Sequence, residues 1–238
     1  MKILELFAGS RSIGKAAEKR GHEVFSVDWK AFEGIDLVID IMELTPQMIP
    51  FVPDGVWGSP DCTTYSIAGV GHHRDGQIPI SEAAKMADEL TKHTLKLIEH
   101  YKGALWGLEN PRGMLRKMGF MKPYDRRTVS YCKYGDNRMK PTDIWGNFFQ
   151  DMFNPDGWQP RPMCYNQNPH CHHEYSPRGE TIRKAKESGI ELATGGTSAL
   201  NGSYERSKIP EKLCEEIIKC WEIQYELSKT FDIFGVSK

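Results

Sequence analysis

The sequence has few cysteines and no long apolar segment. Its six cysteines are spread over 238 residues, too thinly to hold a small domain together by disulfides, so we expect free thiols and a cytoplasmic location. No apolar run approaches the roughly 20 residues that a membrane-spanning helix needs, so no membrane partner is expected. Charged residues interrupt the short apolar run at the N-terminus, which argues against a signal peptide.

An excess of positive charge is also missing. The formal net charge is -1, whereas proteins that bind the phosphate backbone normally carry excess Lys and Arg. The distribution is uneven, however, because residues 112–140 contain nine basic residues and only two acidic ones. Such a run is commonly a solvated surface. This one lies between two motifs described below, and it is equally compatible with a groove that binds a polyanion.

The apolar runs that are present predict buried strands and helices around one core. With 39% hydrophobic residues, the chain can bury a substantial core and carry a small appended region. Ser81, followed by spaced apolar residues, predicts a capped helix through Tyr101. The predicted strands cover residues 2–7, 23–27, 35–39 and 104–108, and a further one ends at Gly58.

The first predicted strand leads into a turn of small residues and the start of a helix. Ala8, Gly9 and Ser10 form the turn, and Ile13 begins a helical pattern of apolar residues. A strand, such a turn and a helix N-terminus together make a site for a negatively charged or dipolar ligand group. Gly9 and Gly14 would let a ligand approach the backbone closely.

The next two predicted strands end in acidic residues. Asp28 and Trp29 follow the second strand, where nucleotide-binding folds hold a ribose through its hydroxyls. Trp29 could stack on an adenine ring or belong to the core. Asp40 and Ile41 end the third strand, and a carboxylate there can accept a hydrogen bond from an adenine amino group. Three consecutive strand ends therefore carry residues able to bind a ligand.

A single cysteine follows the strand that ends at Gly58. Cys62 lies in a loop behind Pro60, and open parallel sheets display reactive side chains at the carboxyl ends of their strands. We interpret Cys62 as a candidate nucleophile. The alternative is a half-buried structural cysteine. The polar, glycine-rich residues 67–80 that follow have the composition of a mobile lid.

Together these motifs resemble those of the DNA (cytosine-5) methyltransferases. Residues 5–9 with Gly14 are similar to the family's first motif, and residues 28–29 and 40–41 are similar to the next two. A segment around Ser207 resembles the family's last motif, which closes the cofactor pocket. The resemblance implies that S-adenosylmethionine binds at Phe7, Ala8, Gly9, Ser10, Gly14, Asp28, Trp29, Asp40, Ile41, Pro60 and Ser207.

Two further motifs resemble those that carry the family's catalytic residues. Pro60-Asp61-Cys62 stands where the family usually has Pro-Pro-Cys, which implies that Cys62 is the nucleophile. Asp61 departs from that motif, and a nearby carboxylate opposes thiolate formation. Glu109 begins a Glu-Asn-Pro run where the family has Glu-Asn-Val. By this match, Glu109 contacts ring nitrogen 3 of the target cytosine.

The basic segment ends in a motif similar to the family's Gln-x-Arg-x-Arg. Asp136 takes the place of the glutamine, Arg138 matches the first arginine, and Lys140 replaces the second. The match implies that Arg138 touches the target base or its backbone and that Lys140 contacts phosphate. The expected catalytic residues are therefore Cys62, Glu109 and Arg138.

The resemblance also implies a fold and a reaction. The fold is α/β, a doubly wound, mostly parallel Rossmann-like sheet with a small irregular insertion. Residues 1–140 would form the cofactor-binding and catalytic domain, 141–202 a small target-recognition region, and 203–238 a C-terminal helical segment that returns to the catalytic domain. The implied reaction methylates carbon 5 of cytosine in double-stranded DNA through a covalent Cys62 intermediate, with the base flipped out of the duplex.

Cysteine and histidine also gather in residues 164–173. Cys164, His170, Cys171 and His173 could supply four zinc ligands. Their spacing fits no standard zinc finger, so we interpret the segment as an irregular loop.

Two other functions are compatible with the sequence. A cytosine-5 methyltransferase acting on RNA would use the same chemistry with a different recognition surface. A non-catalytic protein that binds the cofactor or DNA would account for the Pro-Asp-Cys departure and the short recognition region. Methyl transfer from labelled cofactor distinguishes the enzymes from the non-enzyme.

Overall fold

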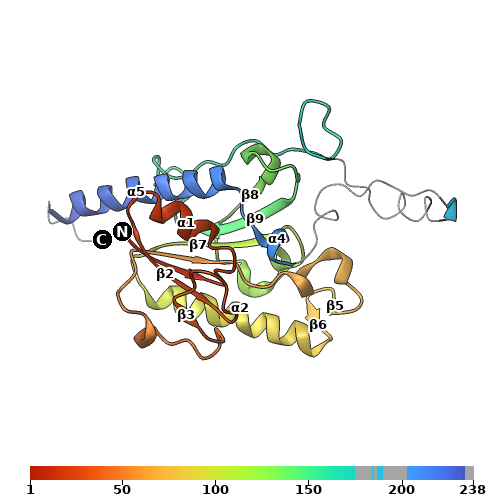
Figure 1. Ribbon diagram of the computed structural model, residues 1–238, viewed down its shortest axis with the longest axis horizontal. Coiled ribbons are helices and arrows are strands. Elements are labelled where there is room, and N and C mark those ends of the chain that lie inside the picture. The colour runs from red at the N-terminus through yellow and green to blue at the C-terminus, as the bar shows by residue number, and fades with distance from the viewer. Residues whose placement is uncertain (175–183, 185–186, 190–202, 234–238) are drawn as a thin grey trace.

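A seven-stranded sheet forms the centre of the molecule (Figure 1). The computed structural model describes residues 1–174, 184, 187–189 and 203–233. The strands follow the spatial order β3-β2-β1-β4-β7-β9-β8. Their bounds are β1 (Lys2–Leu6), β2 (Glu23–Asp28), β3 (Leu37–Val38), β4 (Gly55–Gly58), β7 (Leu105–Pro111), β8 (Arg126–Ser130) and β9 (Pro141–Gly146).

The sheet is mostly parallel. Strands β3, β2, β1, β4 and β7 run parallel to one another, whereas β9 runs antiparallel to both β7 and β8. This arrangement confirms the expected doubly wound α/β fold. The strand order reverses between β1 and β4, and folds of this kind bind ligands outside the carboxyl ends of the strands at such a point.

Helices cover both faces of the sheet (Figure 1). Helices α1 (Ser12–Glu18) and α5 (Glu211–Ile233) pack on one face, and α2 (Glu82–His100) packs on the other. Ser81 caps α2 as expected, because its Oγ accepts a hydrogen bond from the Ala84 amide at 3.1 Å. The short helix α4 (Ser203–Ser207) precedes α5. In the described part of the chain, the helices lack the combination of length and apolar composition that a membrane span requires.

The expected target-recognition region begins inside the main sheet. Strand β9 pairs with β7 and β8, and Phe148, Phe149 and Trp158 are buried in the core that also contains α5. Residues 141–158 therefore share the main sheet and its core. A segment of this length is too short to form a core of its own, so its aromatic side chains bury more of their surface in the large core of the sheet. Residues 175–183, 185–186 and 190–202 of the expected region lie outside the described residues.

The segment expected to be a lid has a fixed point in its middle. Arg74, in the small ribbon formed by β5 (Arg74–Asp75) and β6 (Ile78–Pro79), is fully buried. Its guanidinium pairs with Asp88 of α2 at 2.7 Å and donates to the Thr64 carbonyl at 3.1 Å. Leaving either charge buried and unpaired would be costly, so this pair holds the ribbon against α2 and the turn that follows Cys62.

Candidate active site

The turn that carries Cys62 is held by hydrogen bonds from both sides. The Asn110 side-chain amide of β7 donates to the Pro60 carbonyl at 2.9 Å. The Asp61 carboxylate accepts hydrogen bonds from the Thr63 amide at 3.1 Å and the Thr63 hydroxyl at 2.8 Å. Asp61 thus shapes the turn as a side-chain cap, in place of the stiffness that a second proline would provide. The turn leaves Cys62 partly buried beyond the carboxyl end of β4.

Glu109 lies on β7 beside this turn, and it is almost completely buried. The Tyr131 hydroxyl donates to its Oε1 at 2.9 Å. Burial raises the pKa of Glu109, against the opposing effects of Lys140 and of the Tyr131 hydrogen bond. Burial and the adjacent Glu109 charge also raise the pKa of Tyr131, so the phenol keeps its proton and remains a donor. Glu109 is therefore protonated more easily than an ordinary carboxyl, and its protonated form can donate a hydrogen bond.

The same surroundings disfavour ionisation of Cys62. Burial raises the pKa of the thiol to about 11, and the negative charges of Glu109 and Asp61 add to this effect, whereas Lys140 opposes it. Protonation of Glu109 would remove one of these repulsive charges. The proton on Glu109 and the thiolate at Cys62 therefore favour each other.

We expect Asp61→Asn to lower the pKa of Cys62 below about 11 and to speed its alkylation near pH 8, because the substitution removes one of the charges that oppose the thiolate. The acceleration should stay under about tenfold, since one pKa unit is a factor of ten and Asp61 is exposed to solvent. The measurement is the rate of iodoacetamide modification of the Cys62 peptide against pH. Asp75→Asn, at an exposed acid outside this turn, should leave the profile unchanged. An unaltered profile in Asp61→Asn would contradict the electrostatic role of Asp61.

Lys140 supplies the positive charge of the site. Its ammonium lies 4.7 Å from the centre of the Tyr131 ring and donates to the Arg206 carbonyl at 3.0 Å. Burial lowers the pKa of Lys140, whereas the charges of Glu109 and Cys62 raise it. The motif implies a phosphate contact for Lys140, and no sequence motif points to Tyr131. The replacement of the second arginine by lysine was a signal in the sequence, because a compact ammonium does not reproduce the planar fork of a guanidinium.

Arg138 points into the protein, although the sequence predicts a contact with the substrate. Its guanidinium pairs with Asp136 and donates to the carbonyls of Glu205, Arg206 and Lys208 at 3.2 to 3.4 Å. These contacts engage all three guanidinium nitrogens. Arg138 therefore joins the segment after β8 to α4 and to the chain that enters α5.

The first cofactor motif forms a tight turn against Asp28. Phe7 and Gly9 adopt left-handed backbone conformations, with φ of 55° and 39°. The Gly9 amide donates to one Asp28 oxygen at 3.0 Å and the Lys30 amide to the other at 2.9 Å. A phenylalanine with positive φ costs on the order of 1 kcal/mol or more, and such strain gathers at ligand sites.

Trp29 is not a core residue, because 67% of its surface is exposed. The alternative that placed it in the core is therefore wrong. The Lys30 ammonium lies 4.4 Å from the centre of its ring. An exposed indole beside the Asp28 turn remains available to stack on a planar ligand.

Three other predicted cofactor residues have structural contacts of their own. Asp40 caps the following turn through the Met42 amide at 2.9 Å, and Ile41 is buried in the core. Gly14 provides space for Glu5, since a Cβ at position 14 would lie 2.5 Å from the Glu5 carboxylate. Ile41 and Gly14 therefore contribute to packing. Asp40 caps the turn that follows β3.

The N-terminal and C-terminal motifs meet at the start of α1. The Ser12 hydroxyl accepts a hydrogen bond from the Ile209 amide at 3.1 Å and contacts the Ser10 hydroxyl at 2.8 Å. Ser207 is exposed and donates to the Tyr204 carbonyl at 2.7 Å. The segment that carries Ser207 therefore returns to the first cofactor motif, nearly 200 residues away in the sequence.

A viral protein has a sequence similar to that of this chain. No protein-family model matches the chain. A protein of frog virus 3 (isolate Goorha), named "Probable DNA (cytosine-5)-methyltransferase", is 28% identical over 156 residues. The alignment covers 61% of this chain and 70% of the viral protein.

Two solved structures share the fold over most of its length. A mutant of DNMT2 from Spodoptera frugiperda superposes with a TM-score of 0.52 at 13% identity, covering 92% of this chain and 99% of that one. The methyltransferase EhMeth of Entamoeba histolytica gives a TM-score of 0.53 at 10% identity, covering 94% and 98% of the two chains.

A third structure, described as a DNA modification methyltransferase encoded within an E. coli prophage, is similar only in part. This chain covers 45% of that protein's length, with a TM-score of 0.46 and 16% identity, so the fold comparison relies on the two longer superpositions. The viral sequence is similar to this chain, as the motifs predict, and the two longer superpositions show that the chain shares the fold of these methyltransferases.

Proposed function

We propose that this chain methylates carbon 5 of cytosine in DNA, with S-adenosylmethionine as methyl donor and Cys62 as nucleophile. The observation that carries the proposal is the meeting of three groups at the carboxyl edge of the sheet. Asn110, next to Glu109, donates to the Pro60 carbonyl in the Cys62 turn at 2.9 Å. The Tyr131 hydroxyl donates to Glu109 at 2.9 Å, and the Lys140 ammonium lies 4.7 Å from the centre of the Tyr131 ring. A thiol, a protonatable carboxyl and a cation are the groups that covalent activation of a cytosine requires.

The turn around Gly9 fits the proposed cofactor. Asp28 lies at the end of β2 with both oxygens oriented by backbone amides, a placement suited to ribose hydroxyls. Trp29 offers an exposed ring next to it. Asn110 Oδ1 is buried and has no hydrogen-bond partner among the described residues, which leaves an acceptor beside the Cys62 turn. When bound, S-adenosylmethionine would supply an electrophilic methyl group.

The proposed chemistry begins at Cys62. Carbon 5 of cytosine is a weak nucleophile because the aromatic ring delocalises its electrons. Addition of the Cys62 thiolate to carbon 6 breaks that delocalisation and makes carbon 5 enamine-like. Protonated Glu109 donates to ring nitrogen 3 and neutralises the charge that develops there. After carbon 5 has gained the methyl group, loss of its proton restores the ring and expels Cys62.

Only part of the basic segment is available for DNA. Arg116 and Arg126 pair with the buried Asp143, and Arg138 is held by Asp136, so these three cations support the fold. Three other cations, Arg112, Lys117 and Lys122, are exposed on the segment that follows Glu109. We assign these exposed cations to phosphate contacts, which would offset the few kcal/mol that flipping a base costs.

Transfer of labelled methyl groups from S-adenosylmethionine tests the proposal. Duplex DNA and a structured RNA are offered at equal cytosine content and equal salt, since salt changes affinity for both. Label at carbon 5 of DNA cytosines supports the proposal. Label in RNA alone would establish the RNA alternative. The absence of transfer to either, from a chain that binds the cofactor, would support the non-catalytic alternative.

We expect Asp28→Ala to weaken binding of S-adenosylmethionine by about 10- to 100-fold, because hydrogen bonds to a charged group contribute roughly 1.5 to 3 kcal/mol each. The measurement is isothermal titration calorimetry with the cofactor and the full chain. Glu33→Gln, at an exposed acid in the following loop, should bind the cofactor like the original chain. Equal affinity in Asp28→Ala would exclude a ribose contact at this position.

A further inference from the structure

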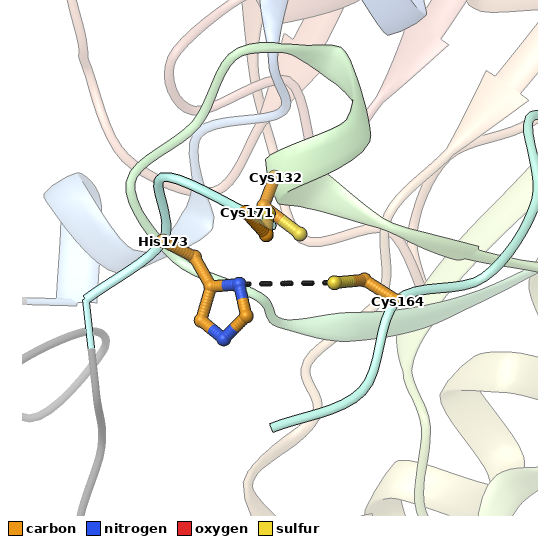
Figure 2. A group of neighbouring side chains, drawn as sticks. All are labelled: Cys132, Cys164, Cys171 and His173. Carbon is orange, nitrogen blue, oxygen red and sulfur yellow. Dashed lines mark hydrogen bonds between the residues drawn. The ribbon is translucent and has the colours of Figure 1, made fainter. Parts of the chain in front are cut away.

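Three cysteines and one histidine converge next to Tyr131. Cys132, Cys164, Cys171 and His173 each offer one ligand atom, and these four atoms all lie within 4.8 Å of one another. Figure 2 shows the side chains meeting from three stretches of backbone. Cys132 comes from the short 3-10 helix Tyr131–Tyr134, and the other three come from the segment after residue 158.

We infer that Cys132, Cys164, Cys171 and His173 bind a structural zinc ion. A tetrahedral zinc with bond lengths of about 2.0 to 2.3 Å places its ligand atoms about 3.5 to 3.8 Å apart. Cys164 Sγ and His173 Nδ1 are already 3.7 Å apart. The remaining separations are at most 4.8 Å, so small side-chain movements would complete the site.

The kind of ligand and its surroundings indicate zinc in a closed site. Three thiolates and an imidazole form one of the ligand sets of structural zinc, and thiolate-rich sites disfavour magnesium and calcium. Cys132, Cys164 and His173 are buried and Cys171 is partly buried. With four protein ligands, the site would keep no open position for a substrate.

The surrounding hydrogen bonds hold the ligands in place. The Asn168 side-chain amide donates to Cys164 Sγ at 3.4 Å, and the Cys164 amide donates to the Ser130 hydroxyl at 3.0 Å. The Cys171 amide donates to the Asn168 carbonyl at 3.1 Å. Contacts of this kind orient metal ligands and stabilise thiolate sulfur. Residues 164–173 contain no helix or strand, and these contacts hold the ligand residues of the loop in place.

This ligand set corrects the one considered from the sequence. His170 is exposed and lies outside the cluster, and Cys132, more than 30 residues earlier, takes its place. Cys132 immediately follows Tyr131, whose hydroxyl contacts Glu109 at 2.9 Å. A metal at this position would tie the loop 164–173 to the backbone that presents Tyr131. The inference concerns the metal alone and does not depend on methyl transfer.

Zinc content and a cobalt spectrum test the inference on the full chain. The purified chain should contain about one zinc per molecule. Exchange for Co²⁺ should give the near-ultraviolet thiolate-to-cobalt band and the intense visible bands of a tetrahedral site. Cys171→Ser, which alters the most exposed of the four ligands, should lose the metal or bind it at least about tenfold more weakly. His170→Ala should keep both zinc and spectrum.

Folding must be separated from metal binding. Circular dichroism and the thermal unfolding midpoint show whether Cys171→Ser is folded, and a chelator should lower that midpoint in the original chain more than in the variant. A folded original chain that binds neither zinc nor cobalt would overturn the inference. A disulfide among the three cysteines in the freshly purified chain would overturn it as well. Equal metal loss in His170→Ala would show that the ligand set is wrong.

Discussion

Replacing Cys62 by alanine is expected to reduce methyl transfer on the order of 10⁴-fold or more, because the substitution removes the group that adds to carbon 6 of the base. Cofactor binding should persist, since the turn around Gly9 and Asp28 is formed by other residues. The measurements are transfer of labelled methyl groups to duplex DNA and calorimetric titration with S-adenosylmethionine. Cys220→Ala, which removes a buried thiol that contacts the Phe148 carbonyl in the core beneath α5, should retain transfer.

A substrate analogue makes the assignment of Cys62 more specific. Fluorine at carbon 5 of the target cytosine blocks the proton loss that expels the thiol, so a covalent complex with DNA should accumulate. Peptide mass spectrometry should locate the link at Cys62, and Cys62→Ala should form none. Transfer at the original rate in Cys62→Ala, or a link at another residue, would exclude Cys62 as the nucleophile.

Glu109→Gln should slow methyl transfer by about 10²- to 10⁴-fold, because an amide cannot give a proton to ring nitrogen 3. The same substitution removes a negative charge that raises the pKa of Cys62, so alkylation of Cys62 near neutral pH should become faster. The two rates are measured as methyl transfer to duplex DNA and as iodoacetamide modification of the Cys62 peptide. Their opposite changes distinguish loss of a proton donor from general damage to the fold.

Two variants set the scale for Glu109→Gln. Tyr131→Phe removes the hydroxyl that orients the carboxyl and should slow transfer less than Glu109→Gln does. Glu99→Gln alters an exposed carboxylate that accepts from Tyr124 and should change neither rate. If Glu109→Gln slows transfer and alkylation together, the charge of Glu109 does not act on Cys62 and the proposed coupling is wrong.

Local sequence patterns were sufficient for most elements of the sheet. The strand around Leu4, the strand that ends at Asp28 and the helix capped by Ser81 all appear where the apolar runs and the cap predict them. These features depend on neighbouring residues and on burial of both sheet faces, which give a strong local signal. Strands β8 and β9 were both missed, because the apolar pattern is weak there and their pairing with each other and with β7 depends on contacts distant in the sequence.

The candidate site was less accessible to local patterns. Cys62 and Glu109 follow or end strands, so their place at one sheet edge could be predicted. The orientation of Arg138 could not, since it depends on carbonyls of residues 205–208. The role of Lys140 depends on burial beside Glu109 and Tyr131. The residues next to Lys140 in the sequence do not indicate this position.

The sequence by itself determined the order of strands and turns, and with it which residues reach the carboxyl edge of the sheet, because periodicity and turn chemistry are properties of adjacent residues. Only the tertiary structure decided which charges share a low-dielectric space. Burial raises the pKa of Cys62 and of Glu109. The folded chain also places Cys132 beside Cys164, Cys171 and His173. Desolvation and ligand geometry arise from residues distant in the chain, so they exist only once the chain has folded.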